Sequence, residues 1–106
     1  MRLLDEVRRK IARRQYEFSK HAMDQTIIRG ITVAELEQAI SNRSEVIEDY
    51  PEDKYGPSGL ILGFTADGRP LHVQCSYPAR PLVKIVTVYE PDPSLWINFR
   101  VRKTDG

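Results

Sequence analysis

The amino-acid sequence predicts an α+β fold, with N-terminal helices packed on one face of an antiparallel four-stranded sheet. Hydrophobic residues recur at helical spacing in the first part of the chain, and the pattern changes to strand-like alternation after residue 42. Turn-forming residues then divide the second part into short runs, as in an antiparallel meander. The 106 residues, 41% of them hydrophobic, fit a single domain over 1–106 with one modest core.

The first helix is expected over about residues 3–14. Leu4, Val7 and Ile11 fall on one stripe of this helix, at the spacing that a buried face requires. The arginines of the segment fall mostly outside the stripe, so they are expected to be solvated. Residues 16–18, "YEF", are expected to form a short extended link to the next helix.

Two further helices are predicted by the residues at their ends. Ser19 is a good N-cap for a helix with the sequence "KHAMDQTIIR", and Gly30 suits its C-terminal end. Thr32 and Glu35 are spaced as a capping box, in which each side chain bonds the backbone N–H of the other residue. A third helix is therefore expected after Thr32, running to about Ile40.

Four strands are expected after residue 42, separated by turns. In chain order the runs are "SEVIEDY", "LILGFTA", "PLHVQCSY" and "LVKIVTVYE". Pro51 stops the first run, and the pair Asp67 and Gly68 favours a hairpin between the second and third. The segment "PDPSLWINF" is expected to close the chain with a short turn that packs Trp96.

Alternation along the strands predicts which side chains share a face. In the third run, one face carries Leu71, Val73, Cys75 and Tyr77, and the other carries His72, Gln74 and Ser76. In the fourth run, one face carries Val83, Ile85, Thr87 and Tyr89. The polar face with His72 and Gln74 is expected to be a surface that faces solvent or substrate.

Charge is distributed unevenly, although the net charge is only +1. Residues 1–20 hold seven Lys or Arg against three Asp or Glu, whereas an acidic stretch, "SEVIEDYPEDK", lies in the middle of the chain. A basic surface attracts phosphates, and an ordinary solvated helix surface is the plainer explanation.

Several other classes of protein are disfavoured. No run approaches the roughly 18 apolar residues of a membrane helix, and the N-terminus does not resemble a secretory signal, so a cytoplasmic protein without a membrane segment is expected. A single cysteine, Cys75, cannot form an internal disulfide. Two histidines are too few for a Cys- or His-rich zinc site, and no metal or other cofactor is expected.

His21 and Arg29 are the first candidates for chemistry. An imidazole titrates near neutral pH and can serve as a general base or acid, and a guanidinium can hold a phosphate with two hydrogen bonds. The two residues are eight apart on one predicted helix, so they lie on nearly the same face. Metal-independent RNA cleavage needs a base, an acid and a cation, with the 2′-hydroxyl as nucleophile. Packing or capping is the alternative explanation for His21 and for His72.

Several blocks of the sequence resemble a known family. They are "FSKHAMDQTIIRGIT", "VIEDYPEDKYGPSGLILGF", "RPLHV" and "TVYEPDPSLW", which together extend over about residues 18–96. In order and content these blocks resemble the domain-of-unknown-function 4258 family of small bacterial and archaeal proteins. Members of that family look like distant relatives of the RelE-type and BrnT-type toxins of type II toxin–antitoxin systems.

The resemblance implies a RelE-toxin-like α+β fold and a metal-independent endoribonuclease that acts on RNA, often at the ribosome. The partner would be an antitoxin of the zinc-finger and helix-turn-helix type. The implied catalytic residues are His21, Arg29, His72 and Tyr89, with Arg80 and Lys84 as further cations for the substrate. The histidines would act as base and acid, Arg29 would hold the phosphate, and Tyr89 would supply a proton or a stacking contact. Gln25 departs from the family pattern, because many members have a basic residue there.

Two other functions stay open. A non-enzymatic protein- or nucleic-acid-binding module would explain the acidic stretch over 45–53 and the loop over 55–59. A metal-dependent nuclease would need carboxylates from several segments, whereas "EDYPEDK" provides acids on one loop. The position of His21 relative to His72 distinguishes the enzyme from the module, because an acid–base pair must reach one substrate.

Overall fold

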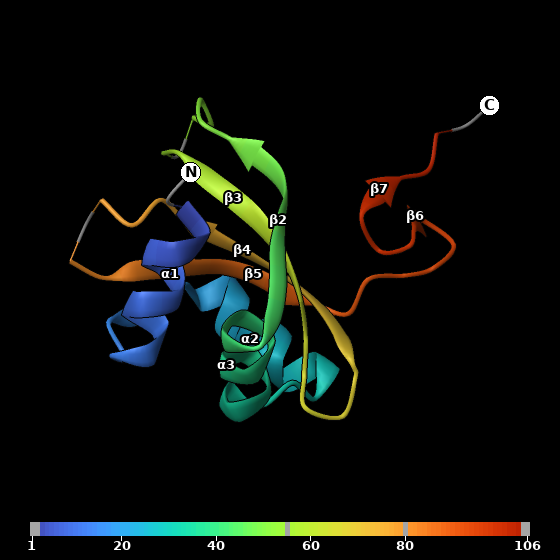
Figure 1. Cartoon of the computed structure of the whole chain (residues 1–106), viewed down its shortest axis with the longest axis horizontal. Helices are drawn as coiled ribbons and strands as arrows, with labels where there is room; N and C mark the ends of the chain where they lie inside the picture. Colours follow the sequence, from blue (N-terminus) through green and yellow to red (C-terminus); the bar gives the residue numbers. More distant parts are fainter. Residues whose placement is uncertain (1–2, 55, 80, 105–106) are drawn as a thin grey trace.

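The computed structural model describes residues 3–54, 56–79 and 81–104. Within these residues the helices are α1 (Leu3–Ala12), α2 (Lys20–Arg29) and α3 (Val33–Ser41). The strands of the main sheet are β1 (Tyr16–Phe18), β2 (Arg43–Tyr50), β3 (Ser58–Phe64), β4 (Pro70–Ser76) and β5 (Val83–Tyr89), and a C-terminal hairpin consists of β6 (Trp96–Ile97) and β7 (Val101–Arg102). Figure 1 shows this hairpin set apart from the helices, beyond the strands. The predicted α+β class is confirmed.

The main sheet has five strands in the order β1-β5-β4-β3-β2. β1 pairs with β5 in parallel, and the other neighbours are antiparallel. The prediction of an antiparallel four-stranded sheet is therefore wrong, because segment 16–18 is an edge strand instead of a link. This strand pairs with residues 83–85, far along the chain. Three residues give no alternation long enough to be recognised in the sequence.

The predicted ends of α2 and α3 are confirmed. The Ser19 hydroxyl oxygen accepts a hydrogen bond from the backbone N–H of Ala22 at 3.0 Å. Gly30 ends α2 in the left-handed conformation, with φ of 63°, which a residue with a Cβ atom adopts less easily. Thr32 and Glu35 form the capping box, and both of its backbone-to-side-chain hydrogen bonds measure 3.0 Å.

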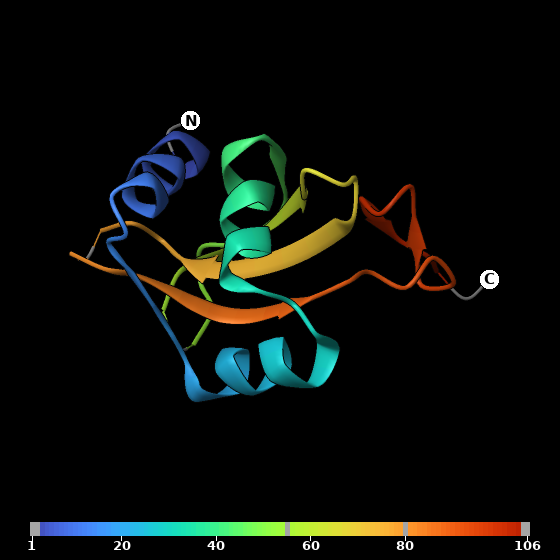
Figure 2. The ribbon, with the colours of Figure 1, turned by 90° about the horizontal axis from the view of Figure 1, so that it is seen from below.

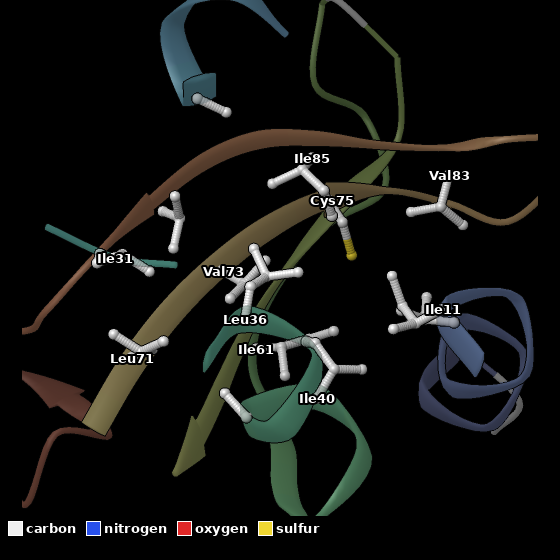
Figure 3. Close-up of a cluster of buried hydrophobic side chains, with 14 of the residues drawn as sticks. Ile11, Ile31, Leu36, Ile40, Ile61, Leu71, Val73, Cys75, Val83 and Ile85 are labelled. Carbon is white, nitrogen blue, oxygen red and sulfur yellow. The ribbon is translucent and has the colours of Figure 1, made fainter. Parts of the chain in front are cut away.

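The helices cover one face of the sheet, called the inner face below, and the main core lies between them. Figure 2 shows α2 beside β5. In Figure 3, Ile11 of α1 and Leu36 and Ile40 of α3 lie around Val73 and Cys75 of β4, and none of these side chains is more than 1% exposed. Removal of this apolar surface from water is the main source of stability. In the described part of the chain, no helix is long and apolar enough to span a membrane.

Gly63 allows β3 to lie directly against α3. A Cβ atom at this position would be 2.0 Å from the carbonyl oxygen of Ala39, far closer than packed atoms come. Arg8 of α1 binds the C-terminal end of α3, where its Nε donates a hydrogen bond to the carbonyl oxygen of Ile40 at 3.2 Å. The position of α3 on the sheet is thus fixed from both sides.

Arg69 joins the turn after β3 to the junction between α2 and α3. Its guanidinium donates to the carbonyl oxygens of Arg29 and Gly30, each at 3.2 Å. It also forms ion pairs with Glu35 at 3.3 Å and Glu90 at 2.8 Å. A planar guanidinium with five N–H groups can bond several acceptors at once, so one side chain connects three segments.

A bulge in β5 changes which side chains share a face. The β4–β5 register pairs Tyr89 with His72 and Ile85 with Cys75, which leaves one residue too many in β5 between these pairs. Ile85 therefore faces the helices together with Cys75, whereas Tyr89 faces the other side together with His72. The prediction that Ile85 and Tyr89 share a face is wrong, because regular alternation does not reveal an inserted residue.

Candidate functional site

The sheet face away from the helices is called the outer face below. The strand register places on it Glu45 and Glu48 of β2, Leu60 and Leu62 of β3, His72 and Gln74 of β4, and Thr87 and Tyr89 of β5. The C-terminal hairpin lies over one end of this face, where the Trp96 ring packs against that of His72 with centroids 4.5 Å apart. Trp96 is thus packed as expected, by a hairpin with two short strands instead of a simple turn.

His72 is fully buried, at 0% exposed, between the outer face and the C-terminal hairpin. Its Nε2 lies 2.6 Å from the carbonyl oxygen of Phe99, and a carbonyl only accepts, so Nε2 carries the proton. Nδ1 then accepts a hydrogen bond from the Tyr89 hydroxyl at 3.1 Å. Burial lowers the pKa of His72, which favours the neutral ring. The expectation that His72 faces solvent or substrate is wrong, because the C-terminal hairpin covers it.

Tyr89 is the second predicted site residue in this buried pair. Its ring centroid lies 5.2 Å from that of His72. Burial raises the pKa of the Tyr89 hydroxyl, which therefore stays protonated and donates to His72, while the positive charges of Arg102 and Arg29 act in the opposite direction. The structure thus brings the buried His72 and the half-buried Tyr89 into contact.

A second polar group of side chains lies near this pair on the outer face; Glu48, Tyr50 and Arg102 are called the Glu48 cluster below. Arg102 Nε and NH2 lie 3.0 and 3.2 Å from the two carboxylate oxygens of Glu48, which also accepts from the Tyr50 hydroxyl. Burial alone would raise the pKa of Glu48, but the hydrogen bonds from Arg102 and Tyr50 outweigh it and the pKa is lowered. Glu48 is therefore ionised at neutral pH.

Two members of the Glu48 cluster, Tyr50 and Arg102, line a cavity of about 730 Å³, and Glu48 lies behind them. The cavity is lined by Tyr50, Pro51, Glu52, Asp53, Gln74 and Arg102. Arg102, whose side chain is 62% exposed, provides a cation, and Gln74 provides an amide. Burial, followed by the hydrogen bond to Glu48, raises the pKa of Tyr50, which therefore stays a hydrogen-bond donor. The cavity is shallow and wide open to solvent.

His21 and Arg29 lie elsewhere, on the exposed side of α2. The helix packs on the inner face through Ala22, whereas His72 lies on the outer face, so the sheet separates the two histidines. They cannot act as base and acid on one substrate, and this outcome counts against the enzyme that was expected from the two histidines. Along the helix axis His21 and Arg29 are about 12 Å apart. Arg29 Nε donates to the Gln25 side chain at 2.5 Å, so Gln25 positions this guanidinium.

The two further cations predicted for the site are not part of the Glu48 cluster. Lys84 of β5 is exposed and lines a different cavity, of about 500 Å³, together with Glu17 and Tyr77. Arg80 lies outside the described residues. Their expected role in holding a substrate stays a prediction.

The sequence analysis did not single out the residues of the Glu48 cluster. Glu48 and Tyr50 belong to the acidic stretch, in which no acid differs from its neighbours by sequence alone. Arg102 follows the family-like blocks and lies 54 positions after Glu48. Regular alternation would also place Glu48 on the face opposite to Glu45, and it is a bulge between Val46 and Glu48 that brings Glu48 to the outer face. The basic run "FRVRK" was the one available signal.

α2 presents an apolar surface to solvent. Ile27 and Ile28 are each 74% exposed, and Met23 is 42% exposed. Met23 and Ile27 are four residues apart on the helix, so their side chains are neighbours. Adjacent exposed apolar side chains are typical of a surface that contacts another protein.

Residues 18–90 match the model of a protein family that is described as a domain of unknown function (DUF4258). No curated protein and no solved structure matches the chain. The matched region contains Glu48, Tyr50, His72 and Tyr89, and it ends before the hairpin that carries Arg102. Among residues 3–54, 56–79 and 81–104, no three His, Cys, Asp or Glu side chains are grouped as metal ligands would be.

Proposed function

The chain belongs to the DUF4258 family. We propose that it is a metal-independent endoribonuclease, the toxin of a type II toxin–antitoxin pair with a RelE-type fold. One observation carries the proposal. Glu48, Tyr50 and Arg102 are joined by hydrogen bonds, and Tyr50 and Arg102 line a shallow, open cavity of about 730 Å³. A carboxylate, a hydroxyl and a guanidinium are the groups that RNA cleavage through the 2′-hydroxyl requires.

The proposed reaction begins with the ionised Glu48 carboxylate, which accepts the proton of the 2′-hydroxyl as its oxygen attacks the adjacent phosphorus. The Arg102 guanidinium stabilises the negative charge of the pentavalent phosphate. Tyr50 donates its proton to the departing 5′ oxygen and recovers one from Glu48, with which it shares a hydrogen bond. The products are a 2′,3′-cyclic phosphate and a free 5′-hydroxyl, and the cluster returns to its starting state.

His72 and Tyr89 have a positioning role in this proposal. Both ring nitrogens of His72 are engaged, one by Tyr89 and one by Phe99 of the C-terminal segment. The pair therefore holds the segment against the outer face. Since Arg102 belongs to the same segment, a change at His72 would move the cation of the Glu48 cluster.

His21 and Arg29 remain a second candidate site for the same activity. Both side chains are exposed, and the hydrogen bond from Arg29 to Gln25 fixes the direction of the guanidinium. Their separation of about 12 Å along the helix means that they would meet different nucleotides of one strand. In this alternative α2 contacts RNA on the side of the sheet opposite the Glu48 cluster.

The antitoxin is proposed to dock on the apolar side of α2. Ile27, Ile28 and Met23 offer no groups that recognise phosphate, so their exposure favours a protein partner over RNA. The same observation favours the alternative function, a non-enzymatic binding module, which would use this surface without any catalysis. Both functions fit a cytoplasmic protein.

Induced expression in bacteria tests the toxin proposal. The wild-type chain should arrest growth and deplete intact messenger RNA, and Glu48→Gln should relieve both effects while the protein stays soluble and folded. Normal growth and intact RNA with folded wild-type protein would contradict the proposal and leave the binding module.

A further inference from the structure

Three arginines from three separate segments meet in a second cavity, at the edge of strand β2. The cavity has a volume of about 250 Å³, and its lining includes Arg8 of α1, Arg43 of β2 and Arg100 of the C-terminal segment. Ser44 and Glu45 complete its polar lining. Guanidinium groups repel one another at short distance, so their convergence needs a compensating negative charge.

The lining residues supply only part of that charge. Arg100 Nε lies 2.6 Å from the carboxylate of Glu45, which is the one acid that lines this cavity among the described residues. Arg8 donates to neutral acceptors, the carbonyl oxygen of Ile40 at 3.2 Å and the Ser44 hydroxyl at 2.9 Å. Three positive charges are therefore set against one negative charge.

Arg43 is held differently from the other two arginines. Its guanidinium carbon lies 5.4 Å from the centroid of the Phe64 ring. Stacking on an aromatic ring orients the plane of a guanidinium and leaves its N–H groups at the rim available for hydrogen bonds. Arg43 is thus presented as an anion-binding group that is already oriented.

The cavity continues the row of charged pairs that contains the Glu48 cluster. Glu45 pairs with Leu62 and Glu48 pairs with Leu60 in the β2–β3 register, so the two acids are successive residues on the outer face, about 7 Å apart. Each binds an arginine of the C-terminal segment, Arg100 and Arg102 respectively. A chain of phosphates that reaches Arg102 would therefore pass Arg100.

We infer that the cavity of Arg8, Arg43 and Arg100 binds a phosphate group. The inference rests on the proposed function in one respect, that this phosphate belongs to the RNA strand next to the bond that is cleaved. A guanidinium binds phosphate oxygens with two parallel charge-assisted hydrogen bonds, and a cavity of this volume accommodates a phosphate with part of its sugar. The other source of the same group is a free phosphorylated small molecule.

Titrations followed by NMR on the full chain test the inference without requiring cleavage. The probes are inorganic phosphate and a 2′-O-methylated RNA hexamer, which has no nucleophile and cannot be cut. Both should shift the resonances of Ser44, Arg43 and Arg100, and the hexamer should bind more tightly. Arg43→Gln should weaken both affinities about tenfold, because it removes hydrogen bonds between charged groups. Arg13→Gln, which removes an exposed arginine outside the cavity, is the control and should leave the affinities unchanged.

The outcomes separate this inference from the proposed function. Equal weakening by Arg43→Gln and Arg13→Gln would show attraction by net charge alone and would overturn the inference. Binding of phosphate but not of the hexamer would keep the phosphate site and assign it to a small molecule. Tight binding of the hexamer at the cavity by a chain that cuts no unmodified RNA would keep the site and overturn the nuclease. If the wild-type chain cleaves RNA and Arg43→Gln leaves the KM for RNA unchanged, the nuclease is kept and the inference is overturned.

Discussion

The Nε2 atom of His72 donates a hydrogen bond to the carbonyl oxygen of Phe99, at 2.6 Å. This contact joins the middle of strand β4 to the C-terminal segment, 27 positions further along the chain. It fixes the tautomer of the ring and removes it from solvent. A histidine in a strand-like stretch is thus the attachment point of a segment that carries two of the charged groups discussed above, Arg100 and Arg102.

The buried His72 should make the stability of the protein depend on pH. Its pKa in the folded chain is lower than the ordinary value of 6.5, so below that pH the unfolded chain binds more protons than the folded chain. The free energy of unfolding should therefore be highest above pH 6.5 and fall as the pH falls towards the pKa of the folded state. Urea unfolding at pH 7.5 and 5.5 measures the effect.

His72→Gln is the matched variant for this measurement. A glutamine amide can donate to Phe99 but does not titrate, and the variant retains His21. The variant should lose less stability between the two pH values than the wild type. An equal loss in both proteins would contradict the assignment of the pH dependence to His72.

Tyr89→Phe should destabilise the protein by about 1–3 kcal/mol, because it leaves the buried Nδ1 of His72 without a donor. Tyr77→Phe is the comparison, since the Tyr77 hydroxyl donates to the exposed Asp49 and water can replace it. Thermal unfolding of both variants measures the difference. Equal effects of the two substitutions would show that the His72–Tyr89 hydrogen bond contributes nothing specific.

Gly63→Ala should destabilise the protein by about 3 kcal/mol or more, because the new methyl group would lie 2.0 Å from the carbonyl oxygen of Ala39. Gly59→Ala is the control on the same strand. A methyl group there would lie 2.9 Å from the end of the Leu3 side chain and 3.6 Å from the nearest backbone atom, so its contact with the backbone is an ordinary one. Circular dichroism during urea unfolding would rank the two variants, and similar midpoints would contradict the packing of α3 on β3.

Arg69→Lys should lower the free energy of unfolding although it keeps the positive charge. A lysine is a point charge and cannot bond the carbonyl oxygens of Arg29 and Gly30 together with the carboxylates of Glu35 and Glu90. The expected loss is about 1–2 kcal/mol. Arg13→Lys, at an exposed position, should leave the unfolding midpoint unchanged, and a comparable shift there would argue against a specific role of Arg69.

The parts of the fold that could be predicted are those whose causes are local. Ser19, Gly30 and the pair Thr32 and Glu35 act on backbone groups within four residues, so their roles are visible in the sequence. β1 could not be predicted, because it exists through its parallel pairing with β5. The bulge in β5, which directs Tyr89 to the outer face, depends in the same way on the neighbouring strand.

The candidate site was predicted in part, for related reasons. The sequence pointed to His72 and Tyr89, which the structure joins, but it predicted a solvent- or substrate-facing position for His72 and a shared face with Ile85 for Tyr89. The C-terminal segment buries His72, and this segment is held in place by contacts between residues far apart in the sequence, such as that of His72 with Phe99. The pairing of Glu48 with Arg102 is equally distant in sequence. No periodic pattern in the sequence encodes such contacts.

The most direct test of the central claim is cleavage of single-stranded RNA by the purified protein in the presence of a chelator. Wild type should cleave, and Glu48→Gln should lower kcat/KM about 100-fold or more, because it removes the general base. Glu52→Gln makes the same change at a carboxylate that lines the cavity beside Tyr50 and should be close to wild type. His21→Ala and Arg29→Ala test the second candidate site in the same assay. Equal cleavage by wild type and Glu48→Gln, or a loss confined to His21→Ala, would contradict the assignment of the chemistry to the Glu48 cluster.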